Sequence, residues 1–168
     1  YNLDGDEIEK ESVEIKWDAE AAEKAGYEHF MIKEIHEQPT ALKTTITPRI
    51  MEHMPFLEEC GITTEMLNHF HKIYIVACGT AMHAGMVGKY VIEKLARVEV
   101  TVDIASEFRY CDPVLSEDDL VILISQSGET ADTRAVLRLA KENHATTLAI
   151  VNVKGSSIAR ESDFVVYT

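Results

Sequence analysis

From residue 72 onward, short apolar runs rich in branched side chains alternate with stretches of helical periodicity. Strands that alternate with helices are typical of a parallel sheet with helices on both faces, and near-continuous apolarity indicates burial on both sides. The pattern therefore predicts an α/β fold with three layers, α-β-α, around a five-stranded, mainly parallel sheet. The expected strands are residues 73–77, 98–104, 120–124, 147–151 and 164–167, and the clearest expected helices are 82–96 and 130–142.

The residues before this pattern predict two further parts of the chain. Residues 1–28 are acidic and are interpreted as a linker region, and residues 29–71 as a helical segment that packs on the sheet domain. Residues 72–168 form the expected sheet domain itself. A length of 168 residues suits one domain of ordinary size.

Local signals refine the outline of these first two parts. Alternating apolar residues predict a short strand over 12–17, followed by a helix over 19–25. Pro39 interrupts a helical pattern, so we expect two short helices that meet at this proline rather than one continuous helix. A further helix is expected over 64–71.

The charge balance restricts the partners that the chain can have. The formal net charge is −13, which argues against general nucleic-acid binding because phosphates require a basic face. Any anionic ligand must therefore be held by local groups, against an unfavourable overall field. No apolar run approaches the roughly 18–20 residues that a membrane helix needs, so we expect a cytoplasmic protein.

The cysteines and histidines predict neither a disulfide framework nor a metal site. Cys60, Cys78 and Cys111 are odd in number and contain no CxxC pair, which is typical of reduced cytosolic thiols. The seven histidines are scattered without the spacing of metal ligands. We expect no metal and no cofactor.

Hydroxyl side chains cluster where the most apolar strand ends. Ser125, Ser127 and Thr130, together with Gly128, lie between that strand and the next expected helix. A strand-to-helix turn exposes backbone N–H groups, and a helix N-terminus favours negative charge, so the segment suits a phosphate monoester. The alternative is that Thr130 merely caps the helix and the serines form a turn. Glu129 counts against an anion site unless its side chain points away.

A second strand end carries weaker signals. Gly79 permits a tight turn and Thr80 offers a hydroxyl, so this segment is either a plain turn or a second ligand contact. Cys78 is interpreted as a core residue rather than a nucleophile, because no base lies near it in sequence. His83 either contacts the ligand or packs, and residues 107–110 form either the rim of the site or an ordinary surface turn.

The loop sequence resembles a known signature. Residues 125–132 read Ser-Gln-Ser-Gly-Glu-Thr-Ala-Asp and resemble the phosphosugar signature of sugar isomerase (SIS) domains. Residues 29–39, 77–80 and 105–110 are similar to segments of glutamine–fructose-6-phosphate aminotransferases (isomerising), also called glucosamine-6-phosphate synthases. Residues 29–39 resemble the segment that joins the two halves of those enzymes. The resemblance runs over most of residues 14–168.

This resemblance implies an SIS fold and a place in amino-sugar (hexosamine) biosynthesis. Enzymes of the family turn fructose 6-phosphate and glutamine into glucosamine 6-phosphate and glutamate. Their N-terminal glutaminase releases ammonia, and a pair of SIS subdomains opens the sugar, takes up ammonia at C2 and moves a proton from C1 to C2. This chain would contain the first SIS subdomain.

The resemblance also assigns roles to individual residues. Many members have serine where this chain has Ala81, so only a backbone contact is expected there. Cys78, Gly79 and Gly128 are possible secondary contacts. The residues expected to bind the sugar phosphate are Thr80, Ala81, Ser125, Gln126, Ser127 and Thr130.

No catalytic residue is expected within this chain. The resemblance places the glutaminase before Tyr1, and the proton-transfer glutamate, the lysines and the ring-opening histidine after residue 168. We therefore expect a fragment that cannot catalyse the reaction alone, taken from a parent that is a homodimer. Two alternatives stay open: a non-enzymatic phosphosugar sensor and a glutaminase-free sugar-phosphate isomerase. The linker-like residues 29–39 favour the aminotransferase over both.

Overall fold

The computed structural model describes Gly5, Glu7 and residues 23–168. The chain divides into two compact units, Tyr1–Leu42 and Lys43–Thr168, and each unit is described by itself. The predicted strand over 12–17 and most of the predicted helix over 19–25 lie outside the described residues. Residues 23–25 form a bend and a turn rather than a helix.

Helix α1, Phe30–Ile46, is one continuous helix with Pro39 inside it, so the prediction of two short helices is wrong. Proline removes one backbone N–H and crowds the carbonyl of Ile35, four residues earlier. These are local penalties, and in a helix of 17 residues the turns on both sides can still form their own hydrogen bonds. The proline therefore does not end the helix.

Short elements connect α1 to the sheet. They are η2 (Thr47–Arg49), an antiparallel pair β1 (Ile50–Met51) and β2 (Met54–Pro55), η3 (Glu58–Cys60) and α2 (Thr64–Leu67). Helix α2 is shorter than the predicted 64–71 because it forms a single turn, capped by the Thr63 hydroxyl, which accepts from Met66 N at 3.3 Å. Ile62 and Phe70, on either side of α2, are buried.

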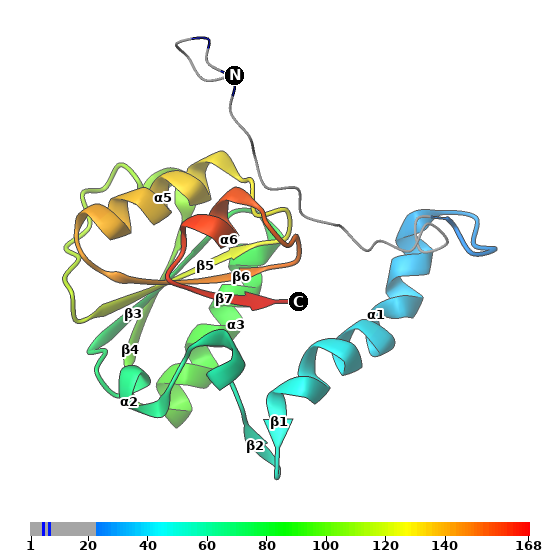
Figure 1. Ribbon diagram of the computed structural model, residues 1–168, viewed down its shortest axis with the longest axis horizontal. Helices are drawn as coiled ribbons and strands as arrows, with labels where there is room; N and C mark the ends of the chain where they lie inside the picture. The colour runs from blue at the N-terminus through cyan, green and yellow to red at the C-terminus, as the bar shows by residue number, and fades with distance from the viewer. Residues whose placement is uncertain (1–4, 6, 8–22) are drawn as a thin grey trace. The chain divides into compact units, whose positions relative to one another are not determined.

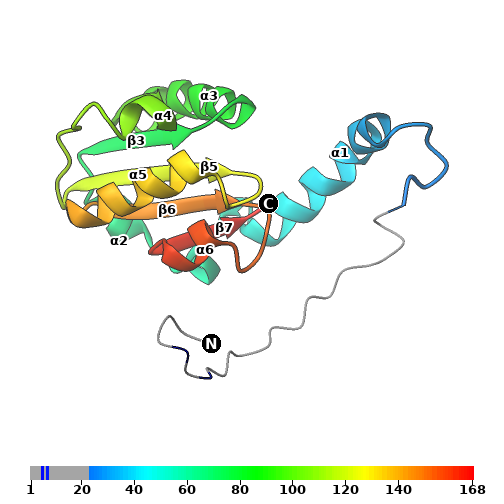
Figure 2. The same ribbon diagram turned by 90° about the horizontal axis from the view of Figure 1, so that it is seen from above.

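The main sheet has five strands in the order β4-β3-β5-β6-β7, and every pairing is parallel. This arrangement confirms the predicted fold class. Figure 1 shows the sheet with helices on its two sides, and Figure 2 shows it from above. The strands are β3 (Lys72–Ala77), β4 (Glu99–Ile104), β5 (Asp119–Ser125), β6 (Thr146–Val151) and β7 (Phe164–Tyr167).

Alternate residues of each strand enter two hydrophobic cores, one on each face of the sheet. Tyr74 and Val76 of β3 point into one core, with Phe108 from α4 (Ala105–Phe108) and Val136 and Leu137 from α5 (Ala131–Glu142). Helix α6 (Ser157–Glu161) joins the same core through Ile158 and Ala159.

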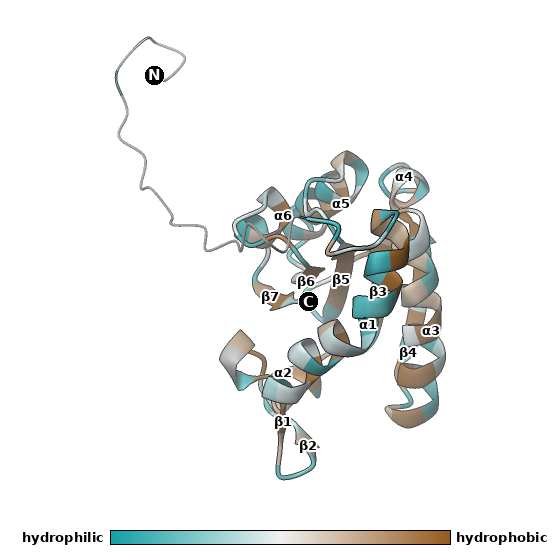
Figure 3. Cartoon of the chain, turned by 90° about the vertical axis from the view of Figure 1, so that its right-hand side faces the viewer, coloured by the Kyte–Doolittle hydropathy of each residue, from teal (hydrophilic) through white to brown (hydrophobic). Residues whose placement is uncertain are grey.

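The opposite core contains Ile73 and Ile75 of β3, together with Ile62 and Phe70 from the segment before the sheet. Helix α3, Thr80–Leu95, packs on this face through Ile92. Figure 3 colours much of α3 brown, in keeping with its apolar sequence. The two cores thus pack helices against both faces of the sheet, and the predicted site lies at the strand ends beyond them.

Candidate sugar-phosphate site

The predicted site lies where the strand order changes direction: after β3 the chain forms β4 on one side of it and then β5 on the other. Strand β3 pairs with β4 on one side and with β5 on the other, and Ala77 is opposite both Ile104 and Ile124. Ligands of open α/β sheets bind outside the carboxyl ends of the strands at such a point. The loops after β3 and β5 therefore meet at the carboxyl edge of the sheet.

A pocket of about 240 Å³ opens between these two loops. Four predicted site residues, Thr80, Ala81, Ser125 and Gln126, line it. Ser127, Thr130 and the secondary candidates Cys78, Gly79 and Gly128 belong to the same two loops but are not among its lining residues. Sequence reasoning missed three further lining residues, which come from strand ends without a motif: Ile124, Ile150 and Thr168.

The hydroxyl loop, residues 125–130, is held closed by its own side chains. Ser125 is 3 % exposed, and its Oγ accepts from Gly128 N at 3.0 Å. The same Oγ lies 3.0 Å from Thr130 Oγ1, and either hydroxyl can donate. Glu129 N donates to Ser127 Oγ at 3.2 Å. The first and last residues of the loop are therefore joined directly.

These contacts leave hydroxyl hydrogens available to a ligand. Each hydroxyl carries one hydrogen, so the Ser125–Thr130 pair uses one and keeps one. Ser127 accepts with its oxygen and keeps its own hydrogen. The serines do form a turn, as the alternative interpretation held, but Thr130 makes no side-chain cap to α5. Forming the turn and donating to a phosphate are compatible roles.

Backbone donors add to this set. The first N–H groups of a helix lack intrahelical partners, and α5 begins directly after Thr130. Ser127 N–H also has no hydrogen-bond partner within the described residues. The partial positive charge at the start of α5 favours an anion in front of the loop.

Glu129 does not oppose an anion, because its carboxylate is turned towards α6. Ser157 N donates to Glu129 Oε1 at 2.6 Å. The backbone hydrogen bond from Ser157 lowers the pKa of Glu129, so the side chain stays ionised in this contact. The residue is absent from the pocket lining. The Glu129 side chain therefore points away from the pocket, as an anion site requires.

The loop after β3 brings a second helix start to the pocket. Gly79 adopts φ +58° and ψ −136°, a backbone conformation that favours glycine, and its carbonyl accepts from Met82 N at 3.1 Å. Helix α3 begins at Thr80 instead of residue 82, because this turn leads straight into it. Thr80 and Ala81 therefore occupy the first turn of α3, where backbone N–H groups lack intrahelical partners, and both residues line the pocket.

The remaining candidates have structural surroundings. Cys78 is partly buried against the core that contains α5, and its sulfur lies 3.9 Å from Thr133 Oγ1. Phe108 is 2 % exposed in that core, so residues 107–110 are more than a surface turn. Arg109 Nη1 donates to Asp132 Oδ1 at 2.8 Å, a contact that no sequence motif indicates.

Comparisons with known proteins show which family this chain resembles. The SIS domain family matches residues 66–168. The chain is 59 % identical, over 169 residues and its whole length, to a glutamine–fructose-6-phosphate aminotransferase (isomerizing) of Clostridium acetobutylicum. It is also 59 % identical, over 98 % of its length, to the aminotransferase of that name from Caldanaerobacter subterraneus.

A solved structure shows the same likeness. The C-terminal domain of glucosamine-fructose-6-phosphate aminotransferase from Francisella tularensis superposes with a TM-score of 0.79 at 46 % identity. The match covers 87 % of this chain and 41 % of that one. The chain spans only 28 % and 27 % of the length of the two curated relatives.

Proposed function

This chain belongs to the SIS domain family, and we propose that it is the sugar-phosphate-binding part of the isomerase half of a glutamine–fructose-6-phosphate aminotransferase. The identity to relatives of that name extends over the whole chain. In the whole protein, the proposed reaction turns fructose 6-phosphate and glutamine into glucosamine 6-phosphate and glutamate, a step of hexosamine biosynthesis. This chain supplies the phosphate site.

One observation carries the proposal: two loops rich in hydroxyls and backbone donors converge on one pocket at the carboxyl edge of the sheet. None of the side chains that line the pocket carries a charge. A phosphate dianion would therefore be held by O–H and N–H donors and by the starts of α3 and α5. This explains how a chain of net charge −13 can bind an anion.

The proposed binding contacts come from both loops. Ser127 and Thr130 of the hydroxyl loop donate to phosphate oxygens. Gln126 and Thr80, which line the pocket, contact the ligand from its sides. Ala81 offers its backbone. Cys78, Gly79 and Gly128 shape the loops without donating side chains.

Chemistry at the sugar carbons needs groups beyond this pocket. The side chains that line it include no carboxylate, imidazole or amine that could move a proton. Binding without turnover is therefore the proposed activity of this chain alone, and the catalytic groups belong to other parts of the whole protein. We expect no glucosamine 6-phosphate above a no-protein control when the chain is supplied with fructose 6-phosphate and ammonia.

The wider assignments follow from the same proposal. Residues 1–28 act as a linker, residues 29–71 as a helical segment that packs on the SIS domain, and residues 72–168 as that domain. The whole protein is a cytoplasmic homodimer with a glutaminase and a second SIS unit. Within the described residues, no helix is both long and apolar enough to cross a membrane.

The exposed apolar face of α3 supports contact with another part of the whole protein. Val87, Tyr90 and Leu95 of this helix are 64 %, 73 % and 76 % exposed. A cluster of large apolar side chains on one helix face is typical of a surface that is covered in an assembly.

Calorimetry with fructose 6-phosphate tests the site. A hydrogen bond to a charged partner contributes about 1.5–3 kcal/mol, so Ser127→Ala and Thr130→Ala should each weaken binding roughly ten- to a hundredfold. Thr146→Ala, at the opposite end of the sheet, is the matched control and should bind as wild type. Fructose without phosphate should not bind. If both loop variants bind fructose 6-phosphate as tightly as the control, the site lies elsewhere.

A further inference from the structure

The segment between β6 and α6, residues 152–158, lies directly against the hydroxyl loop. Asn152 N donates to the carbonyl of Gln126 at 3.2 Å, and Ile158 N donates to the carbonyl of Gly128 at 3.0 Å. The two segments thus share backbone hydrogen bonds at both ends of residues 152–158. This contact links a third loop, which carries no phosphosugar signature, to the proposed binding site.

These bonds determine where the loop's own N–H groups point. In a trans peptide, the C=O of one residue and the N–H of the next are directed to opposite sides. Because the Gln126 carbonyl faces Asn152, the N–H of Ser127 is directed away from residues 152–158. It has no partner within the described residues, so it is presented on the free side of the loop.

Close packing reinforces the same conformation. A Cβ built on Gly128 would lie 2.0 Å from Ser156 Oγ and 2.5 Å from Ser156 Cβ, so the two backbones are as close as glycine permits. Ser156 itself is 3 % exposed. Close packing therefore resists movement of the loop towards residues 152–158, and the two backbone hydrogen bonds resist movement away only at Gln126 and Gly128.

Glu129 completes the contact with a side chain. Its Oε1 accepts from Ser157 N at 2.6 Å, the shortest of the three hydrogen bonds between the segments. We propose that Glu129 is a positioning residue: its carboxylate fastens the hydroxyl loop to residues 152–158 and so holds the Ser127 and Thr130 donors where the phosphate binds. This inference rests on the proposed sugar-phosphate site. Glu129 itself does not touch the ligand.

A competing role is that Glu129 only stabilises the start of α6. The two roles differ in what a substitution changes. A residue that merely stabilises α6 affects unfolding and leaves ligand affinity unchanged, whereas a positioning residue changes affinity while the fold is retained. Glutamine separates the effects further, because its side-chain oxygen still accepts the Ser157 N–H without a charge.

The experiment measures fructose 6-phosphate affinity by calorimetry and thermal unfolding on the same samples. Glu129→Ala removes the contact and lowers the fraction of loops in the binding conformation, so apparent affinity should fall roughly tenfold. Glu129→Gln keeps the contact and should bind within about threefold of wild type. Glu142→Ala removes an exposed carboxylate from the far end of α5 and should leave affinity unchanged.

The outcomes separate this inference from the proposed function. If Glu129→Ala binds as wild type while Ser127→Ala loses affinity, the sugar-phosphate site stands and the positioning role is refuted. If Glu129→Gln is as weak as Glu129→Ala, the hydrogen bond does not position the loop and the inference fails. If the wild-type chain does not bind fructose 6-phosphate, both the proposed function and this inference are contradicted.

Discussion

Replacing Gly128 by alanine tests whether the hydroxyl loop packs against residues 152–158. Gly128 adopts φ +65°, in the left-handed region, and the new Cβ would lie 2.0 Å from Ser156 Oγ. Two penalties therefore act at one position: backbone strain and a steric clash. Gly155 is a matched control in the neighbouring loop, because it has φ +72° and nothing within 4 Å of its Cβ position.

The magnitudes follow from these two terms. A residue other than glycine in the left-handed region costs about 1–2 kcal/mol, and overpacking a tight site costs about 1–3 kcal/mol more. Gly128→Ala should therefore reduce the free energy of unfolding by about 2–5 kcal/mol, and Gly155→Ala by about 1–2 kcal/mol. For a chain of this size, each kcal/mol corresponds to roughly 2–4 °C in Tm.

Urea and thermal unfolding of the single and double variants give the assay. Ser156→Gly removes both atoms that clash with the new Cβ, so the double variant Gly128→Ala/Ser156→Gly should recover the clash term but not the strain term. Its coupling energy should be about 1–3 kcal/mol, from the overpacking cost. Fructose 6-phosphate affinity should fall for Gly128→Ala and stay near wild type for Gly155→Ala.

Equal destabilisation by Gly128→Ala and Gly155→Ala would mean that the clash with Ser156 does not exist. Additive effects of Gly128→Ala and Ser156→Gly would mean the same. Either result would mean that the hydroxyl loop does not pack against residues 152–158.

Two further substitution sets test the fold that supports the site. Gly85→Ala brings a Cβ 2.8 Å from Ile75 Cγ2 and should destabilise the protein by about 1–3 kcal/mol. Gly88→Ala makes an ordinary 3.5 Å contact with Ile75 and should stabilise the protein by up to about 1 kcal/mol. Urea unfolding measures both variants, and an equal effect would contradict the close approach of α3 to β3. Thr147 is buried, and its N and Oγ1 donate to Asp163 Oδ2 at 2.9 and 2.6 Å. Asp163→Ala leaves both donors without this acceptor and should lower the free energy of unfolding by about 1–3 kcal/mol at pH 7 in the same assay. Burial raises the pKa of Asp163, but hydrogen bonds from Thr147 and Lys141 outweigh it and leave the pKa lowered. The part of the stabilisation that depends on the ionised carboxylate is therefore present above the unfolded value of about 3.9 and is lost as the pH falls through the folded value. The difference between wild type and Asp163→Ala should shrink over that range, and a difference that keeps its pH 7 size at lower pH would contradict the reasoning.

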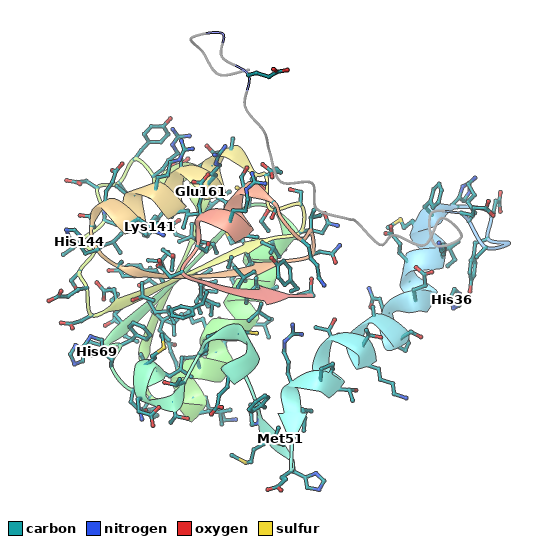
Figure 4. The ribbon with its side chains drawn as sticks, viewed as in Figure 1. His36, Met51, His69, Lys141, His144 and Glu161 are labelled. Atoms are coloured by element: carbon teal, nitrogen blue, oxygen red, sulfur yellow. The ribbon has the colours of Figure 1, made fainter. Side chains whose placement is uncertain are left out.

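The polar contacts between α5 and α6 illustrate interactions that a sequence pattern does not reveal. Lys141 and Glu161, labelled in Figure 4, meet through a hydrogen bond from Lys141 Nζ to the Glu161 carbonyl at 2.7 Å. Arg134 also pairs with the Glu161 carboxylate and lowers its pKa. These residues are 20 to 27 positions apart, so neither helical nor strand spacing connects them.

The sheet could be predicted because strands that are buried on both faces have continuous apolar sequences. Strand β5 is buried at nearly every position and is apolar from Leu120 to Ile124, so its sequence is unlike that of a helix or a loop. The strand-to-helix turn after it could be predicted for the same reason, since Gly128 and the hydroxyls follow at once.

The rest depended on tertiary context. Proline propensity predicted a break in α1, but a proline costs one turn and the helix continued through Pro39. The orientation of Glu129 could not be read from its neighbours, because its partner Ser157 lies 28 residues away. The Ser125–Thr130 hydrogen bond likewise appears only once the loop is folded.

A crystal structure of this chain with fructose 6-phosphate tests the sugar-phosphate site most directly. We expect the phosphate at the carboxyl edge of the sheet, about 3 Å from the Ser127 and Thr130 hydroxyls and the Ser127 N–H. Thr80 should approach from the start of α3, and Glu129 should keep its contact with Ser157. A phosphate bound at another place, with the hydroxyl loop empty, would contradict the proposed site.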